Sequence, residues 1–372
     1  MRIGRVVLVV GVLAVGAAAY VALTPYGPSE SGKGGETFVD IAPGTGTVGI
    51  ARQLERAGVL RSRYVLEAMK AVHGGTFKAG EYRFDHPATP AEVYDQLRRG
   101  DVYTLTVVIP EGYNIFDVAN AVAAAGFVRS PAHDDTAVMN GAPVDFHGVP
   151  GISREEFLRA EMQHTELIAR WSPHATSLEG YLFPDTYRFS RHATPVQILS
   201  AMVKRFGQQA ARLGLGSSPT RDGEAVTDGA PRSSGSSRDV ADIVTMASLV
   251  EKEVHIDGER AEVASVFENR LAAGMPLQTD PAVVYASLLR GTWTGVIHQS
   301  ELHSDSAYNT YVHKGLPPGP VCNPGAAALQ AALHPAKTEY LYFVADANGA
   351  TRFAATLAEH NANVAAYRAA AR

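Results

Sequence analysis

The chain has 372 residues, of which 46% are hydrophobic and 19% are charged, so two or three globular domains are expected. The net charge of −5 gives no sign of a nucleic-acid partner, and the single cysteine, Cys322, excludes an internal disulfide bond. The 13 histidines show no ligand-spaced motif and no glycine-rich nucleotide-binding sequence occurs, so neither a metal nor another cofactor is expected.

Residues 1–23 predict a short cytoplasmic start and a transmembrane helix, because Arg2 and Arg5 precede an uncharged apolar run. A helix of about 18 residues would rise roughly 27 Å, close to the ~30 Å hydrocarbon core of a bilayer. The arginines would stay in the cytoplasm and the rest of the chain would face outward. A cleaved signal peptide is the alternative, since Ala17-Ala18-Ala19 offers small residues for cleavage. Residues 24–35, rich in Gly, Pro and Ser, are expected to form a tether.

One strand–turn–helix unit occurs twice in the next part of the chain. Ile41-Ala-Pro-Gly44 aligns with Ile109-Pro-Glu-Gly112, and the apolar positions that follow match without a gap. Each copy predicts a strand, a glycine turn, an amphipathic helix and a glycine after the helix. Two copies are too few for a solenoid. Between them, residues 90–100 predict a short helix stopped by glycine, and residues 102–109 a strand rich in β-branched residues.

The rest of the chain alternates helices and loops, which indicates a mixed α+β domain. Helices are expected at residues 155–169, 196–213, 261–273, 281–289, 326–332 and 357–371. Residues 340–345 and 351–354 predict a hairpin around a turn at Asn348-Gly349. Residues 128–151 lack periodicity and are expected to be a loop. Residues 217–238, rich in Ser, Gly, Asp and Arg, predict a mobile surface insertion; a tolerated insertion is expected, and a gating role is the alternative.

Residues 245–253 contain the strongest candidate for catalysis. Apolar residues recur at helical spacing from Val240 onward, and Glu251 falls on the same face of the expected helix. A carboxyl held against an apolar face loses hydration and keeps its proton more readily, as a general acid must. An ordinary surface glutamate at a helix end is the alternative, and Glu253 is a rival for the same role.

Four further segments are dense in Tyr, Asn, Gln, Thr and Pro. Their side chains offer hydrogen bonds and flat aromatic faces, which suits sugars because a pyranose has polar edges and apolar faces. Well-made structural turns are the alternative, and composition does not separate the two. The segments are 178–187, 277–281, 307–311 and 315–319.

Eight segments, taken in their order along the chain, resemble the YceG-like family of endolytic murein transglycosylases, and the resemblance covers roughly residues 36–370. The segments that carry the resemblance are Glu179-Gly-Tyr-Leu-Phe-Pro-Asp-Thr-Tyr187, Ala247-Ser-Leu-Val-Glu-Lys-Glu253, Ala264-Ser-Val-Phe-Glu-Asn-Arg-Leu271, Leu277-Gln-Thr-Asp-Pro281, Tyr308-Asn-Thr-Tyr311, Gly315-Leu-Pro-Pro-Gly319, Asn323-Pro-Gly325 and residues 334–346. The resemblance implies an α+β protein with an N-terminal transmembrane helix, a small LysM-like α/β module at residues 36–105 and a mixed α+β catalytic domain at residues 106–372. The module is expected either to contact glycan or only to space the catalytic part.

The resemblance also implies the reaction. Members of this family cleave the β-1,4 bond between N-acetylmuramic acid and N-acetylglucosamine inside peptidoglycan strands, as lyases. The muramoyl 6-hydroxyl attacks its own anomeric carbon and forms a 1,6-anhydro end. Because the substrate supplies the nucleophile, a single carboxyl can suffice, whereas a hydrolase needs a second one.

The family's catalytic position matches Glu251, which would protonate the leaving oxygen and then accept the proton of the 6-hydroxyl. The expected sugar-binding residues are Glu179, Gln278, Thr279, Asp280, Tyr308, Asn309 and Tyr311. Glu179 is equally open to a scaffold role. Asp280 is also open to capping a helix that begins with Pro281.

The expected setting is the cell membrane, with a single-pass anchor, a cytoplasmic N-terminus and an extracytoplasmic catalytic domain. The expected partners are peptidoglycan strands, the membrane and the peptidoglycan polymerases that work on it, and cutting new strands would end their elongation. Two other functions stay open. One is a water-using glycoside hydrolase with Asp280 as second carboxylate, and the other is a non-catalytic cell-wall-binding scaffold.

Overall fold

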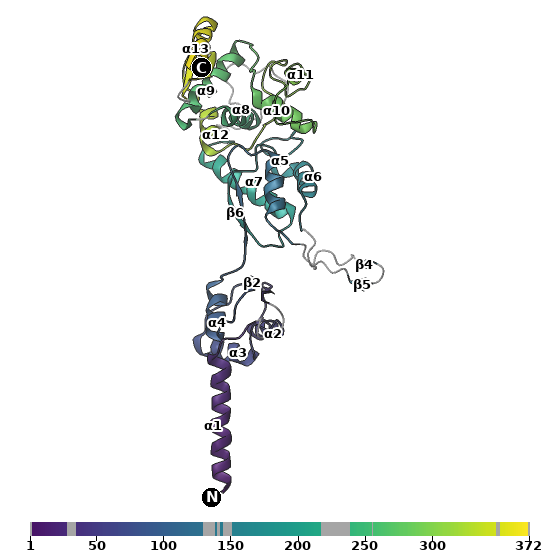
Figure 1. Cartoon of the computed structure of the whole chain (residues 1–372), viewed down its shortest axis with the longest axis vertical. Helices are drawn as coiled ribbons and strands as arrows, with labels where there is room; N and C mark the ends of the chain where they lie inside the picture. The colour runs from purple at the N-terminus through teal and green to yellow at the C-terminus, as the bar shows by residue number, and fades with distance from the viewer. Residues whose placement is uncertain are drawn as a thin grey trace, which may run out of the picture. The chain divides into compact units, whose positions relative to one another are not determined.

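The computed structural model divides into two compact units (Figure 1). Unit 1 comprises Met1–Leu105 with Arg188–Arg191, and unit 2 comprises Thr106–Tyr187 with His192–Arg372. The residues that the structure describes are 2–27, 35–128, 138–139, 142–143, 151–216, 239–254, 256–346 and 350–370. The insertion expected at residues 217–238, most of the expected loop at residues 128–151 and the turn at Asn348-Gly349 lie outside the described residues.

Unit 1 packs helices against one antiparallel strand pair. Its elements are α1 (Arg2–Leu23), β1 (Thr37–Ile41), α2 (Thr47–Arg56), α3 (Arg63–His73), β2 (Gly80–Phe84) and α4 (Pro90–Arg99). Thr37 pairs with Phe84 and Ile41 with Gly80, and Tyr82 and Leu97 are fully buried in the core between strands and helices. Helix α4 ends at Gly100 in the left-handed region, as predicted. Within the described residues, no helix combines the length and the apolar character that a membrane crossing requires.

The predicted strand–turn–helix repeat is confirmed. In the first copy, β1 leads through Gly44 (φ 84°) into α2, and Gly58 (φ 76°) follows the helix. In the second copy, β3 (Leu105–Ile109) leads through Gly112 (φ 77°) into α5 (Ile115–Ala124), and Gly126 (φ 82°) follows. All four glycines adopt a backbone conformation that L side chains avoid. The two copies differ in their pairing, because β1 pairs with β2 whereas β3 pairs with β6 (Asp185–Phe189).

Unit 2 is mainly helical, with short strand pairs, and confirms the mixed α+β class. Its further elements are β4 (Val138–Met139), β5 (Ala142–Pro143), α6 (Arg154–Gln163), α7 (Pro195–Arg212), α8 (Val240–Glu253), α9 (Arg260–Ala272), α10 (Asp280–Leu289), α11 (Gln299–Leu302), α12 (Ala326–Leu333), β7 (Tyr342–Ala345), β8 (Thr351–Ala354) and α13 (Leu357–Ala370). One prediction needs correction, because the single helix expected at residues 155–169 is interrupted. His164 leaves helical geometry (φ −102°, ψ 39°), and the chain continues as the 3₁₀ helix Thr165–Ile168.

Helix α8 contacts α9, α10 and α12, and Figure 1 shows it among these helices. Every residue from Ile243 to Val250 is buried, so the helix is enclosed on all faces and not only along the predicted stripe. Asp239 caps its N-terminus by accepting a hydrogen bond from the backbone N–H of Ala241. Glu251, Lys252 and Glu253 form the polar C-terminal end of this enclosed helix.

Candidate active site

Glu251 lies where three helices meet. Its side chain is 6% exposed. One carboxylate oxygen, Oε2, accepts a hydrogen bond from the backbone N–H of Gly325 at 2.9 Å, and Oε1 accepts one from Arg260 Nη2 at 3.3 Å. Gly325 is the N-cap of α12 and Arg260 is the first residue of α9. Both oxygens therefore act as acceptors, and the start of α12 together with the Arg260 guanidinium fixes the orientation of the carboxyl group.

The turn after β3 packs against this glutamate. The Gly112 N–H donates to Asn323 O at 3.0 Å, and the Asn323 N–H donates to Tyr113 O at 2.8 Å. Lys252 Nζ reaches Gly112 O at 3.4 Å. A Cβ added to Gly112 would lie 3.7 Å from Glu251 Cγ. The turn is thereby fastened both to α8 and to the segment that carries Gly325.

A cavity of about 370 Å³ lies at the polar end of α8. This volume falls in the usual range for sites that bind small molecules. Its walls combine two carboxyl groups with one ammonium group and several apolar or aromatic side chains. The lining residues are Asn114, Lys252, Glu253, Asp280, Pro281, Val284, Tyr285, Leu288 and Val321.

The two carboxyls in this cavity have different surroundings. Burial raises the pKa of Glu253 to about 7; the charge of Asp280 adds to the rise and Arg270 opposes it. Asp280 is exposed, and its Oδ1 accepts a hydrogen bond from the Tyr311 hydroxyl at 2.7 Å. A carboxyl with a pKa near 7 can hold and release a proton at neutral pH. The structure thus gives Glu253 a property that a general acid needs.

The expected capping role of Asp280 is wrong. Thr279 occupies the N-cap of α10 and makes no side-chain capping bond, while Asp280 is the first helical residue. The carboxylate still lies in the first turn, where the helix dipole favours negative charge. Its hydroxyl partner, Tyr311, was expected at the same site, so the structure brings these two residues together.

The loop before α10 contains the unusual backbone of Gln278. Its φ of 53° is the one positive value among the described non-glycine residues. The Gln278 N–H donates to Thr310 O at 3.0 Å, and the Thr279 N–H donates to Thr310 Oγ1 at 2.9 Å. Gln278 is exposed, whereas Thr279 is 1% exposed. Strained backbone of this kind concentrates at functional sites. Gln278 can therefore reach a ligand, and Thr279 holds the loop in place.

Two other expected sugar-binding residues serve the interior. Asn309 is fully buried, and its Nδ2 donates to the carbonyl oxygens of Glu301, Leu302 and Ser304 at 3.2, 3.1 and 2.8 Å. The ring of Tyr308 lies 5.1 Å from that of Tyr285, which lines the cavity, and burial raises the pKa of Tyr308 to about 12. Asn309 thus holds three backbone carbonyl groups by hydrogen bonds, while Tyr308 packs against Tyr285 in the wall of the cavity.

Glu179 is 3% exposed and lies inside unit 2. Its Oε2 accepts a hydrogen bond from the Ile115 N–H at 3.0 Å, and its Oε1 accepts one from Asn323 Nδ2 at 3.2 Å. Burial raises the pKa of Glu179 to about 8, although the hydrogen bond from Ile115 opposes the rise. These contacts favour the scaffold alternative, in which Glu179 connects the start of α5 to the segment before Gly325.

Several residues of this region carried no signal in the sequence. Arg260 and Tyr285 lie outside the segments that were singled out, and they reach the site only through the packing of α9 and α10. Cys322 is fully buried and its Sγ donates to Ser248 O at 3.3 Å, which suits a structural residue. Within the described residues, no group of three or more His, Cys, Asp or Glu side chains is arranged to hold a metal ion.

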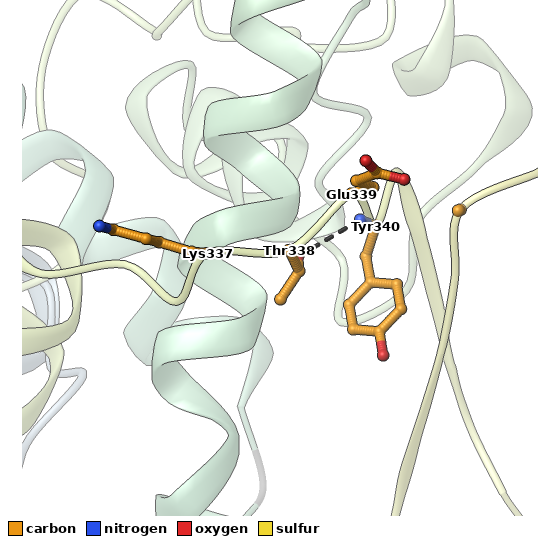
Figure 2. Close-up of a pocket in the computed structure, with 5 residues that line it drawn as sticks. Lys337, Thr338, Glu339 and Tyr340 are labelled. Atoms are coloured by element: carbon orange, nitrogen blue, oxygen red, sulfur yellow. Dashed lines mark hydrogen bonds between the residues drawn. The ribbon is translucent and has the colours of Figure 1, made fainter.

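A second, open groove of about 600 Å³ lies on the segment before β7. Its lining residues are Lys337, Thr338, Glu339, Tyr340 and Ala355. Figure 2 shows Lys337 and Glu339 pointing away from each other and the hydrogen bond from the Tyr340 N–H to Thr338 Oγ1, which spans 3.3 Å. Lys337 and Glu339 are exposed, and none of the carboxyls described above lines this groove. The cavity at the end of α8 is therefore the stronger candidate for the chemistry, because Glu253 and Asp280 line it. Glu251 is not among its lining residues, but it directly precedes Lys252, which is.

Comparison with known proteins places the chain in a family. The model of the YceG-like family matches residues 39–366. An endolytic murein transglycosylase of Bacillus subtilis is 32% identical over 330 residues, which cover 87% of this chain and 82% of the relative. A Streptococcus pneumoniae protein of the same name is 27% identical over 88% of this chain, which spans only 57% of that longer relative. The crystal structure of a YceG-like protein from Listeria monocytogenes has a TM-score of 0.53 and 28% identity, with 88% of this chain and 98% of that chain covered. The chain belongs to the YceG-like family.

Proposed function

We propose that this protein is an endolytic murein transglycosylase that cleaves the β-1,4 bond between N-acetylmuramic acid and N-acetylglucosamine and leaves 1,6-anhydro ends. Family membership and the names of the relatives support the activity. The observation that carries the site assignment is the carboxyl of Glu251, held by Arg260 and the Gly325 N–H at the end of a buried helix.

In the proposed mechanism, Glu251 takes part in two proton transfers, first as the donor and then as the acceptor. It first donates a proton to the oxygen that leaves the anomeric carbon, and it then accepts the proton of the muramoyl 6-hydroxyl as that oxygen bonds to the same carbon. One carbon–oxygen bond breaks, one forms, and Glu251 regains its proton. Arg260 Nη2 and the Gly325 N–H hold the carboxyl group of Glu251 in place for both proton transfers.

We propose that the exposed side chains of Gln278 and Asp280, with the half-buried Tyr311, contact sugar hydroxyl and acetamido groups. The other expected binding residues support them from the interior, since Glu179, Thr279 and Asn309 are all at most 3% exposed. Tyr308 is half-buried behind Tyr285. In this proposal, the exposed residues contribute to the affinity for sugar, and the buried residues keep the site rigid.

A second function is favoured by one specific observation. Glu253, with its pKa raised to about 7, and Asp280 line the same cavity. Two carboxyls around one site are what a water-using glycoside hydrolase needs. Replacing Glu251, Glu253 and Asp280 singly with the matching amide separates the proposals. A transglycosylase that uses Glu251 loses activity chiefly with Glu251→Gln, whereas the hydrolase loses it with the other two variants and forms no anhydro ends.

We also propose, on the sequence, that residues 1–23 anchor the protein in the cell membrane with the N-terminus in the cytoplasm. The small module at residues 36–105 would then stand outside as a LysM-like part that contacts glycan, and cutting new strands beside the peptidoglycan polymerases would end their elongation. Cell fractionation and protease digestion of spheroplasts test the topology. Recovery of the protein in the cytosol, or protection of unit 2 from external protease, would contradict it.

A further inference from the structure

We propose that Glu111 is a second carboxylate of the reaction centre, which rests on the proposed function and deepens it. Glu111 lies in the turn between β3 and α5 and is exposed. The proposed mechanism gives it no role, and it does not line the cavity at the end of α8. Its position beside Glu251 follows from two glycines.

Gly325 lies between the two carboxyl groups. Its N–H donates to Glu251 Oε2 at 2.9 Å. A Cβ added to Gly325 would fall 1.9 Å from Glu111 Oε1 and 2.1 Å from Glu111 Cδ, far inside contact distance. A residue with a side chain cannot stand at position 325 unless Glu111 moves. One buried glycine therefore touches both carboxyl groups.

Gly112 supplies the second connection between the same two glutamates. It follows Glu111 directly, and a Cβ at this position would lie 3.7 Å from Glu251 Cγ. The hydrogen bonds that join Gly112 and Tyr113 to Asn323 fix the turn to the segment that contains Gly325. The backbone that carries Glu111 is thus set relative to Glu251, while the Glu111 side chain is open to solvent.

The internal repeat shows that the turn itself does not need this carboxyl. The first copy has Pro43 at the place of Glu111, and it forms the same strand–turn–helix unit. The glycines after these residues have nearly equal backbone angles, φ 84° at Gly44 and 77° at Gly112. A glutamate is therefore not required for the turn.

An exposed carboxylate next to Glu251 can assist the cleavage of a glycosidic bond. Breaking a glycosidic bond passes through a transition state in which the anomeric carbon and ring oxygen carry positive charge. A fixed negative charge near that ring stabilises the transition state without forming a bond to the sugar. Glu251, held by Arg260 and Gly325, would exchange the proton, and Glu111, on the exposed turn next to Gly325, would face the charged ring. The ligand is a glycan of N-acetylated amino sugars, and no further reactant is needed.

The test compares Glu111→Gln and Glu111→Asp with Glu251→Gln in the full chain, assayed on uncrosslinked peptidoglycan strands in detergent. Glu339→Gln is the matched control, because Glu339 is another exposed glutamate of unit 2. We expect Glu111→Gln to lower kcat by about 100-fold while KM stays within about twofold, with Glu111→Asp in between. The control should match the wild type, and the unfolding midpoints should agree.

A binding measurement separates this role from a merely structural one. The probes are two N-acetylglucosamine oligomers, one neutral and one that ends in a cationic iminosugar. Glu111→Gln should weaken binding of the cationic oligomer at least tenfold and leave the neutral one unchanged. Wild-type kcat in Glu111→Gln beside an inactive Glu251→Gln would overturn this inference and keep the proposed function. Full activity of both variants would overturn the proposed site as well.

Discussion

Replacing Glu179 with glutamine should change how the stability of unit 2 depends on pH. The folded protein raises the pKa of Glu179 from its usual 4.5 to about 8, mainly through burial. Between these values the folded state binds the proton more tightly than the unfolded state does. The resulting stability is fully present below pH 4.5 and is lost as the pH rises through 8.

The size of the effect follows from the two pKa values. Moving the pKa from 4.5 to about 8 corresponds to about 5 kcal/mol between acidic and alkaline pH. Glutamine resembles the uncharged acid and keeps an oxygen that can accept the Ile115 N–H, but its NH2 group cannot accept the hydrogen bond that Asn323 Nδ2 donates to Oε1. We therefore expect Glu179→Gln to be about 1 kcal/mol less stable than the wild type at pH 5, because this bond is lost, and about 3 kcal/mol more stable than the wild type at pH 9.

Tryptophan fluorescence during urea unfolding measures this difference, because Trp171 and Trp293, the two tryptophans of the chain, both belong to unit 2. Trp171 stacks on Tyr181, with ring centroids 6.2 Å apart. Tyr181 lies two residues after Glu179, so the fluorescence of Trp171 reports on this region. The exposed Glu155 provides the control variant Glu155→Gln, whose curve should follow the wild type. Parallel stability–pH curves for Glu179→Gln and the wild type would refute the reasoning.

Three further predictions follow from the contacts of the site. Arg260→Ala leaves the carboxylate of Glu251 buried without its guanidinium partner, so unfolding measurements should show a loss of about 3 kcal/mol together with loss of strand cleavage; a variant as stable as the wild type would contradict the ion pair. Asn323→Ala removes the side chain that bonds the Leu182 N–H, Tyr113 O and Glu179, so it should cost about 3 kcal/mol, and unchanged stability would show these bonds to be dispensable. Glu253→Gln should leave cleavage within about tenfold of the wild type, whereas Glu251→Gln should lower it by more than about 100-fold; the reverse order in a strand-cleavage assay would move the catalytic role to Glu253.

The repeat and the helices could be predicted from the sequence because local rules fix them. Glycines at both ends of each copy and apolar residues at helical spacing determine the strand–turn–helix unit without reference to distant residues. The interruption at His164 was missed, since nothing in the helical pattern there marks the change of backbone angles. The extent of burial of α8 was underestimated, because it depends on three helices that pack around it.

The candidate site could be predicted only in part. Glu251, Asp280 and Tyr311 were singled out, and the structure places them on or near the polar end of α8 and α10. Thr279 and Asn309 have the polar character of binding residues, yet inside the fold the Thr279 hydroxyl contacts the Thr310 hydroxyl and the Asn309 amide donates to backbone carbonyls. Side-chain type does not separate these uses, since a buried carbonyl and a sugar hydroxyl both need a hydrogen-bond partner. Arg260 and Glu111 reach the site through tertiary packing, which no local pattern reports.

The most direct test is mass spectrometry of glycan products released from peptidoglycan strands by the wild type and by Glu251→Gln. The account predicts internal cuts that end in 1,6-anhydro-N-acetylmuramic acid for the wild type and no such products for a variant that folds and binds glycan normally. Reducing ends that have taken up water, or anhydro products from Glu251→Gln at the wild-type rate, would contradict it.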